Sequence, residues 1–413
     1  MVGAGPAGIA AATHAAEAGA RVLLVDCEER PGGQVWRHHQ AAPRPARPWI
    51  ERLSRCGAAT MPGTSVVDAP APGTLLVETG GRGGLVRYER LVLATGARER
   101  FLPFPGWTLP GVVGAGGAQA LLKQGARFDG RRVAVAGTGP LLPAVAAALA
   151  AAGARVVGIA EQAPLARLVG FGGGLVRHPG KALQALGYAS RLLATPYRAG
   201  AWVTSATGSG GVEAVRLTDG RHEWTWRCDV LACGFGLVPN LELARLLGCA
   251  TDGDILVLDE RQRTSVPEVY AAGELGGIGG EAHALLTGAA AGLAAAGRPL
   301  PEAIRRDRAR EQAFARSLAR TFELRDELRT LGQSDTVVCR CEDVTLEQIG
   351  TCLSAREAKL RTRAGMGSCQ GRVCGPALAF IRGFSADSVR PPLEPVAVEL
   401  LASGWRDRAR SGG

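Results

Sequence analysis

The sequence predicts an α/β protein in which one βαβ unit is inserted in another, followed by a small helical domain towards the C-terminus. Two glycine-rich segments predict the α/β part, one starting at Gly3 and one at Gly137. In both, a turn glycine follows 16 positions after the first glycine, at Gly19 and Gly153. This repeat indicates two copies of one structural unit. Four cysteines in two close pairs beyond residue 338 predict the separate C-terminal domain.

Length and charge limit the function classes. The chain has 413 residues, which at about 100–200 residues per domain predicts about two to four domains. Its net charge of +10 comes from arginines interleaved with acids, as in residues 305–311. That pattern is typical of a solvated helix face, so we expect no nucleic-acid partner. The basic surface leaves attraction to an acidic partner subunit or to anionic lipid open.

Cysteine usage and hydropathy indicate the compartment. Ten cysteines, with no segment of the secretory type, indicate a reducing environment. The longest weakly charged run, residues 133–154, is interrupted by glycines and prolines, so we expect no transmembrane segment. A cytoplasmic protein is therefore expected, with a peripheral position at the inner membrane as the further option.

The first glycine-rich segment is a full dinucleotide-binding fingerprint. Gly3 and Gly5 permit a tight turn close to a pyrophosphate, and Gly8 lets the following helix pack on its strand. Asp26 lies 23 residues after Gly3, at the end of the strand 21–25, and can accept hydrogen bonds from ribose hydroxyls. Only two residues precede Gly3, so we expect a short first strand and a start that lacks upstream residues.

Three further segments indicate which dinucleotide binds. Residues 32–34 follow the acid, residues 88–96 form a strand with a small-residue turn, and residues 264–274 deliver Glu274 to a helix N-terminus. Together they resemble the two-dinucleotide-binding-domain flavoproteins, which implies FAD with an acid at its ribitol. Aspartate is usual there, so Glu274 is a departure, and helix capping is the alternative interpretation. The expected FAD-binding residues are Gly3, Gly5, Pro6, Ala7, Gly8, Asp26, Gly33, Gln34, Ala94, Thr95, Gly96, Gly273 and Glu274.

The second glycine-rich segment departs from the fingerprint. Leu142 stands where the third glycine belongs, Ala160 matches Asp26, and Glu161 comes one residue late. A bulky leucine would push the helix away from a pyrophosphate, and a shifted acid would miss a ribose. We therefore expect a Rossmann unit of the NAD(P) type that keeps its fold while its nucleotide is lost or changed.

Cys339, Cys341, Cys369 and Cys374 form a pattern typical of a metal centre. Two cysteines one residue apart do not readily form a disulfide, but both sulfurs can reach one centre. Flanking glycines let the backbone wrap closely and turn N–H groups towards sulfur. The C-x-C and C-x4-C spacings fit zinc knuckles poorly, and a redox chain favours a [2Fe–2S] cluster. Zinc and unligated buried thiols are the alternatives.

The other cysteines and the histidines give weaker signals. No C-x-x-C pair lies in the second unit, which argues against disulfide chemistry of the thioredoxin-reductase type. Cys228 and Cys233 are expected core residues. His283 follows a glycine-rich loop and could approach a flavin, although a core or surface histidine is the simpler interpretation.

Six motifs resemble the FAD-bearing α subunit of the opine (octopine and nopaline) oxidases, hydrogen cyanide synthase and D-hydroxyproline dehydrogenase. They are residues 104–111, 137–142, 233–240, 272–280, 339–344 and 362–374. The cysteine-bearing motifs are the most specific, and they are similar to the bacterioferritin-associated ferredoxin module. Only 27 residues separate Cys341 from Cys369, fewer than this resemblance leads us to expect, so the helices between them must be short.

The resemblance implies a division of labour. A separate β subunit, similar to D-amino-acid oxidases, would take hydride from the carbon next to the substrate nitrogen. Electrons would then pass through an FMN at the interface and the [2Fe–2S] cluster to the FAD of this chain, and on to a quinone or dye. A small third subunit belongs to the same expectation. No catalytic residue is assigned, because the sequence offers no substrate-oxidising group of its own.

The expected architecture is a flavoprotein with five segments. These are an FAD domain (1–106 and 230–298), an inserted NAD(P)-type Rossmann domain (107–229), a helical connector (299–334), a [2Fe–2S] domain (335–390) and a tail (391–413). The connector is expected to be helical because apolar residues recur near helical spacing from Phe314 to Leu331. Two rival functions remain, a self-sufficient NAD(P)H-dependent flavin reductase that delivers electrons through its cluster and a zinc-stabilised scaffold subunit.

Overall fold

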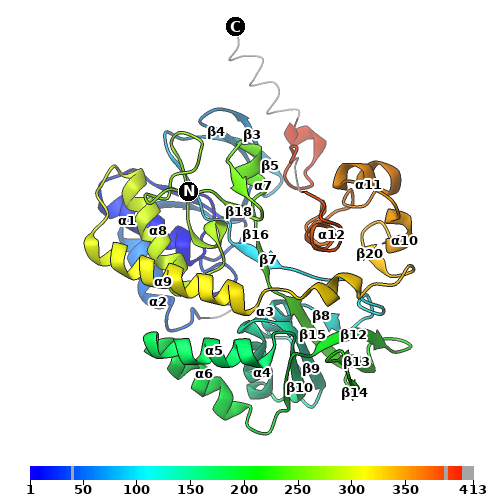
Figure 1. The fold of residues 1–413 in the computed structure, drawn as a ribbon. Helices are drawn as coiled ribbons and strands as arrows, with labels where there is room; N and C mark the ends of the chain where they lie inside the picture. Colours follow the sequence, from blue (N-terminus) through cyan, green and yellow to red (C-terminus); the bar gives the residue numbers. More distant parts are fainter. Residues whose placement is uncertain (39–40, 386–388, 402–413) are drawn as a thin grey trace. The chain divides into compact units, whose positions relative to one another are not determined.

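The computed structural model describes residues 1–38, 41–385 and 389–401, which fall into two compact units (Figure 1). Unit 1 comprises residues 1–98, 238–316 and the C-terminal part from 387. Unit 2 comprises residues 99–237 and 317–386. This division is coarser than the five segments expected from the sequence, whose boundaries stay a prediction.

Unit 1 is built on a parallel sheet with the order β2–β1–Val2–β6–β19. Val2 bridges Val25 of β1 on one side and Leu93 of β6 on the other, so the expected short first strand consists of one bridging residue. Three antiparallel strands, β3–β4–β5, form a separate sheet. The elements are α1 (Pro6–Glu17), β1 (Leu23–Val25), α2 (Arg47–Arg55), β2 (Ala59–Met61), β3 (Thr64–Ala71), β4 (Thr74–Thr79), β5 (Arg82–Arg87), β6 (Leu91–Leu93), α7 (Glu242–Leu246), β17 (Thr251–Asp252), β18 (Ile255–Leu256), β19 (Val269–Ala271), η2 (Gly273–Gly276) and α8 (Glu281–Ala295).

Helices α1 and α8 pack closely because two glycines of α8 face the backbone of α1. A Cβ at Gly288 would lie 2.2 Å from the Ala7 carbonyl oxygen, and one at Gly292 would lie 2.2 Å from that of Ala11. Any side chain there would force the helices apart. The contact with α8 therefore fixes the position of α1, and of the glycine loop that precedes it, within unit 1.

Unit 2 combines a five-stranded parallel sheet, in the order β11–β10–β9–β15–β8, with an antiparallel sheet β12–β13–β14. Its elements are β8 (Val112–Val113), α3 (Ala115–Lys123), β9 (Arg132–Thr138), α4 (Leu141–Ala151), β10 (Arg155–Glu161), α5 (Leu165–Gly174), η1 (Leu175–Arg177), α6 (Pro179–Arg191), β11 (Tyr197–Ala199), β12 (Trp202–Thr207), β13 (Ala214–Thr218), β14 (Glu223–Arg227), β15 (Val230–Phe235), η3 (Asp326–Thr330), β20 (Val337–Cys339), β21 (Val344–Thr345), α10 (Leu346–Ile349), α11 (Ala355–Thr362) and α12 (Cys374–Arg382). Three more elements span a boundary between the units, β7 (Ala97–Glu99), β16 (Leu237–Pro239) and α9 (Glu302–Thr321).

Strand β9 lies at the centre of unit 2 and is buried on both faces. Val133 and Val135 belong to the cluster that packs under α4, whereas Ala134 and Ala136 belong to a second cluster on the opposite face. Residues of the C-terminal segment, including Leu328, Val373 and Phe380, join that second cluster. The cysteine-bearing segment therefore shares a hydrophobic core with the second Rossmann unit.

The two turn glycines end α1 and α4 in the same way. Gly19 and Gly153 both have positive φ, at 91° and 85°. In each case the next residue donates back to the last turn, Ala20 to the Ala15 carbonyl and Ala154 to that of Leu149. This confirms the 16-residue repeat as two copies of one strand–helix–turn unit.

Within the described residues, no helix is long and apolar enough to cross a membrane.

Candidate functional site

The N-terminal glycine loop, residues 3–8, can only be built with glycine at two positions. Gly3 has φ 101°, and a Cβ there would lie 2.2 Å from the Ala94 carbonyl oxygen. A Cβ at Gly8 would lie 1.7 Å from the Gly3 carbonyl oxygen. Helix α1 starts after Gly5 with no side-chain cap and no acid in its first turn. Its first N–H groups are thus open to an anion such as a pyrophosphate.

Asp26 lies against this loop. One carboxylate oxygen accepts from the Ala4 N–H, and the other accepts from the Glu28 N–H at 2.7 Å. Burial raises the pKa of Asp26, while the two N–H donors oppose that shift. The acid therefore stands at the end of β1, next to the glycines, as the fingerprint predicts.

Two distant segments meet the glycine loop. A Cβ at Gly33 would lie 2.9 Å from the Gly5 Cα, and a Cβ at Gly273 would lie 2.9 Å from the Ala7 Cβ. Gln34 follows on an exposed turn. Four stretches of sequence thus form a cradle with little room for side chains, which suits an extended dinucleotide.

Thr95 and Gly96 are held by a residue to which the sequence assigned no role. The Thr95 hydroxyl donates to the Asn240 carbonyl oxygen at 2.7 Å, and the Asn240 amide donates to the Thr95 carbonyl oxygen at 2.8 Å. The Asn240 N–H also donates to the Gly96 carbonyl oxygen at 2.9 Å. Asn240 is the last residue of the motif 233–240. In the sequence, that motif supports only the family resemblance and assigns no role to Asn240.

Glu274 is half-buried and accepts hydrogen bonds from the loop before α8. Its two carboxylate oxygens accept from the N–H groups of Gly279 and Gly280, at 2.7 and 3.0 Å. Burial raises the pKa of this carboxyl, and the two N–H groups oppose the shift. His283, in the first turn of α8, is buried against Gly279. These contacts are those of the capping alternative, and a role towards a ribitol stays a prediction.

In the second unit, a β-bulge corrects the expected position of the acid. Gly137 has φ 131°, and a Cβ there would lie 1.8 Å from the Gly234 carbonyl oxygen, so its role as fingerprint glycine is kept. The β9–β10 ladder slips between Val156 and Gly158, and Glu161 therefore pairs with Gly137. Asp26 has the same place, because it follows Val25, which pairs with Val2. The expectation that Glu161 is displaced by one residue is wrong in space, because the bulge absorbs the extra residue.

The Glu161 carboxylate is fully used inside the protein. It accepts from the Thr138 hydroxyl at 2.9 Å, the Gly139 N–H at 2.7 Å and the Ala163 N–H at 2.8 Å. The side chain is wholly buried, and burial raises its pKa to about 7. Glu161 therefore stabilises the loop between β9 and α4 and presents no free oxygen to a ribose.

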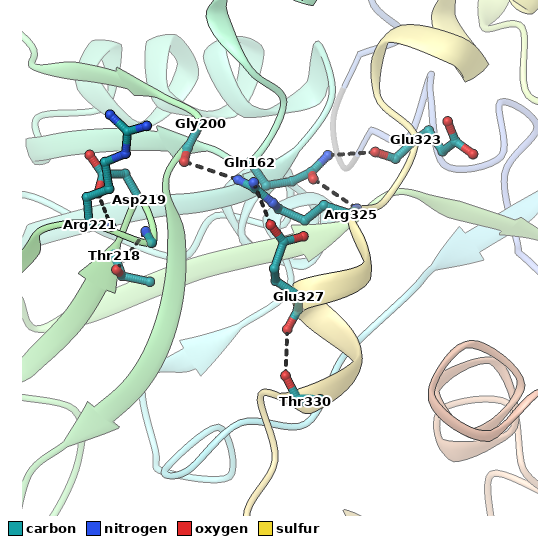
Figure 2. Close-up of polar contacts among 10 residues, drawn as sticks. Gln162, Gly200, Thr218, Asp219, Arg221, Glu323, Arg325, Glu327 and Thr330 are labelled. Atoms are coloured by element: carbon teal, nitrogen blue, oxygen red, sulfur yellow. Dashed lines mark hydrogen bonds and ion pairs between the residues drawn. The ribbon is translucent and has the colours of Figure 1, made fainter.

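The connector segment, residues 322–325, lies across the carboxyl ends of β9, β10 and β11. Gln162 donates to the Glu323 carbonyl oxygen at 3.1 Å and accepts from the Arg325 N–H at 3.2 Å (Figure 2). The Arg325 guanidinium donates to the Gly200 carbonyl oxygen and lies 4.0 Å from the centre of the Trp202 ring. The carboxyl ends of a parallel sheet are where a nucleotide binds. The chain's own backbone occupies this edge.

A half-buried carboxylate that caps a helix of this unit was missed from the sequence. Glu99 accepts from the N–H groups of Gly116 and Gly117, at 2.7 and 3.0 Å, and so caps α3. Burial raises its pKa, and the two donors oppose the shift. Glu99 lies in a short strand far from α3 in sequence, and nothing local in the sequence signals this contact.

All four predicted cysteine ligands line one cavity of about 90 Å³ in unit 2. Cys339 ends β20, Cys341 follows in the turn, Cys369 lies before α12, and Cys374 is the first residue of α12. Cys339 and Cys374 are buried, whereas Cys341 is exposed. The remaining wall is formed by Phe101, Trp107, Arg340 and Val373.

Glycines let the backbone close around these thiols. A Cβ at Gly367 would lie 2.2 Å from the Cys341 Cβ, and one at Gly365 would lie 3.5 Å from the Gly371 Cα. Hydrogen bonds from the backbone and side chain of Cys369 lower the pKa of the Cys341 thiol. Burial and the neighbouring Cys339 raise that of Cys374. The four thiols are thus neighbours: Cys369 contacts Cys341, and both Cys339 and Cys369 lie near Cys374.

The four cysteines surround a cavity without forming a ready-made site for one metal ion. Among the described residues, no three His, Cys, Asp or Glu side chains converge on a point that could hold one metal ion. The cavity is larger than the roughly 30 Å³ share of a water molecule, so the four cysteines leave room for a bound group.

Comparisons with known proteins identify the family of this chain. The family model described as pyridine nucleotide-disulphide oxidoreductase matches residues 1–288. One subunit of the opine oxidase of Rhizobium meliloti is 34% identical, with 97% of both chains covered. Hydrogen cyanide synthase subunit HcnB of Pseudomonas aeruginosa is also 34% identical, over 91% of this chain and 90% of that protein.

Solved structures show the same fold. L-proline dehydrogenase from P. horikoshii covers 97% of this chain, and this chain covers 78% of it, with a TM-score of 0.67 and 21% identity. Thioredoxin reductase of T. acidophilum covers 72% of this chain and is itself covered to 96%, with a TM-score of 0.56 and 24% identity. The predicted α/β FAD-binding fold and the predicted resemblance are both confirmed. The chain belongs to the pyridine nucleotide-disulphide oxidoreductase family, in the group that contains this opine oxidase subunit together with hydrogen cyanide synthase subunit HcnB.

Proposed function

We propose that this chain is the FAD- and [2Fe–2S]-containing electron-transfer subunit of a heteromeric, dye-linked amino- or imino-acid dehydrogenase of the opine or D-hydroxyproline type. One observation carries the proposal. Four cysteines that are far apart in sequence line a single cavity, in a chain similar along 97% of its length to one subunit of opine oxidase. Four cysteine thiolates are the ligand set of a [2Fe–2S] cluster, whose function is single-electron transfer.

The FAD would be held in unit 1. The N–H groups at the start of α1 would receive its pyrophosphate, with Gly3, Gly5 and Gly33 giving close access. Asp26 is placed to accept from a ribose hydroxyl, and Glu274 would orient the loop of Gly279 and Gly280 beside the ribitol. A bound flavin supplies the ability to exchange either one or two electrons.

The cluster would be held by Cys339, Cys341, Cys369 and Cys374. Backbone N–H groups and the Ser368 hydroxyl, 3.8 Å from the Cys341 sulfur, would stabilise the thiolate form. Trp107 closes the cavity and is fixed by its indole N–H, which donates to the Val337 carbonyl oxygen at 2.6 Å. A bound [2Fe–2S] cluster supplies single-electron transfer. The chain's own residues would exclude water and hold the thiols in place.

The partners follow from this role. Substrate oxidation would take place on a β subunit similar to D-amino-acid oxidases, with an FMN at its interface with this chain, and a quinone or dye would accept the electrons. A small third subunit completes the set of partners, and the proposed location is cytoplasmic. NAD(P)H is left without a function, because the connector segment lies where its nucleotide would bind.

The test is a complex of this chain with its β subunit, examined by stopped-flow spectroscopy. The purified chain alone should not oxidise an opine or a cyclic D-imino acid, and the complex should do so with a dye as acceptor. In a Cys374→Ser complex, substrate should still reduce the β-subunit flavin, while transfer to the FAD of this chain stops. Amine oxidation by the chain alone at the rate of the complex would refute the electron-transfer role.

A further inference from the structure

Helices α5 and α6, and the η1 turn between them, form a segment without any buried residue. We call residues 165–193 the hairpin; its one buried residue is Leu192, which follows α6. The hairpin lies in unit 2, where α6 contacts α4 (Figure 1). Six large aliphatic side chains on it are at least 65% exposed: Leu165, Val169, Val176, Leu183, Leu186 and Leu193. Single exposed hydrophobics are ordinary, but six on one short segment indicate a surface that binds something.

The spacing places these side chains on the outer faces of the helices. Leu165 and Val169 are four residues apart on α5, and Leu183 and Leu186 are three apart on α6, so each pair shares a face. On α6 the opposite face bears half-buried Tyr188, which packs against the core under α4. The exposed leucines of α6 therefore point away from the rest of unit 2.

The charge around these side chains has one sign. Between Glu161 and Glu213 the sequence contains no aspartate or glutamate. The same stretch contains Arg167, Arg177, Lys181, Arg191 and Arg198, and all but the half-buried Lys181 are exposed. The charges carried by the hairpin itself are thus all positive, although Arg167 pairs with Glu323 at 3.7 Å. An apolar face that carries only cations of its own is complementary to an anionic surface with an apolar interior.

Glycines make α5 adaptable. Gly170, Gly172, Gly173 and Gly174 lie at its C-terminal end, and a Cβ at any of them would meet nothing within 4 Å. Their backbone does not have positive φ, so neither space nor conformation requires glycine there. Each weakens the helix relative to alanine. Such a helix becomes more stable when its apolar face is covered.

We propose that the hairpin docks this chain on the surface of an anionic membrane. The aliphatic side chains would enter the headgroup region, and the arginines would pair with lipid phosphates. A protein partner fits less well, because the centres of protein interfaces are rich in aromatic residues and poor in charge, whereas the large exposed apolar side chains of the hairpin are all leucine or valine. The inference does not depend on the cluster, since no residue of the hairpin lines the cysteine cavity or the FAD cradle.

Vesicle flotation of the full-length chain with FAD bound tests this docking. The chain should bind vesicles of phosphatidylcholine and phosphatidylglycerol, bind pure phosphatidylcholine weakly, and lose binding as salt rises. Leu183→Glu combined with Leu186→Glu should lower the partition coefficient by about tenfold or more. The matched control is Leu353→Glu with Leu360→Glu, two leucines of unit 2 that are 89% and 73% exposed outside the hairpin.

A second pair of substitutions tests the contribution of charge to binding without disturbing the fold. Arg177→Gln with Arg191→Gln should reduce binding to anionic vesicles and leave the flavin spectrum and the thermal unfolding unchanged. Binding that is equal in the hairpin and control variants would overturn the proposal, as would an absence of binding to anionic vesicles. It would also be overturned if the wild-type chain dimerised through the hairpin, with Leu183→Glu and Leu186→Glu yielding monomers that bind vesicles as before.

Discussion

At the scale of single residues, Asp26 and Glu161 hold equivalent places at the ends of paired strands but differ in what surrounds them. Asp26 accepts two backbone N–H groups beside a loop that is open to a ligand. Glu161 accepts three hydrogen bonds and is wholly buried, which raises its pKa to about 7. The same acid position would serve a ligand in the first unit, whereas in the second unit it serves the fold.

The raised pKa of Glu161 predicts a specific dependence of stability on pH. Between about pH 4.5, where the carboxyl ionises in the unfolded chain, and about pH 7, the folded chain holds a proton that the unfolded chain has released. The free energy of unfolding should therefore fall as pH rises through this window, by at most about 1.4 kcal/mol per pH unit from this group. Glu161→Gln should remove that slope in urea unfolding series, whereas Glu223→Gln, at an exposed site of unit 2, should keep it. An identical slope in wild type and Glu161→Gln would contradict the prediction.

The four cysteines should act as one set. Serine at any of Cys339, Cys341, Cys369 or Cys374 should remove the long-wavelength visible absorption and about two iron atoms per chain. FAD should remain bound, because its cradle lies in unit 1. Cys352→Ser is the matched control, since Cys352 is also buried in the cysteine-bearing segment but does not line the cavity. Iron retained in all four variants would remove the cluster from the proposal, and a colourless protein with one zinc per chain would favour the scaffold alternative.

At the scale of elements, the connector segment is held mainly by Gln162, which bonds to Thr138, Glu323 and Arg325. Gln162→Ala should leave buried polar groups unpaired and lower the free energy of unfolding by about 1–3 kcal/mol. It should also speed amide hydrogen exchange in residues 322–325. Gln184→Ala, at an exposed position on α6, should change stability by less than about 0.5 kcal/mol. Equal exchange in both variants would show that the segment is fixed by other contacts.

Some elements of this fold could be predicted from the sequence and others could not. The glycine spacing and Asp26 depend on short-range geometry, so the first unit and its site could be predicted by counting residues. The position of Glu161 could not, because the bulge between Val156 and Gly158 leaves no mark in the spacing. The contacts of Gln162 with Arg325 and of Glu99 with Gly116 join residues distant in the sequence, and only the packed structure reveals them.

At the scale of the whole molecule, two units of the dinucleotide-binding type share one chain, and in the second unit residues 322–325 lie across the carboxyl ends of the sheet. Anaerobic mixing with NADH or NADPH should therefore bleach the bound FAD slowly or not at all. The measurement is the flavin absorbance near its visible maximum, with dithionite as the control that the flavin can be reduced. Rapid stoichiometric bleaching at micromolar NADH would overturn this expectation and favour the self-sufficient reductase.

The position of the connector segment bears on whether the activity of such a complex depends on the cell's NADH. An enzyme whose flavin exchanges electrons with NADH is poised by the cell's ratio of NADH to NAD⁺ and can run backwards when that ratio is high. Under the proposed function, a chain whose own backbone covers the NADH-binding edge would not respond to that ratio. The amine substrate and the electron acceptor would then set the direction of electron flow. Substrate turnover in extracts should then be indifferent to added NADH, even when NADH is present in large excess.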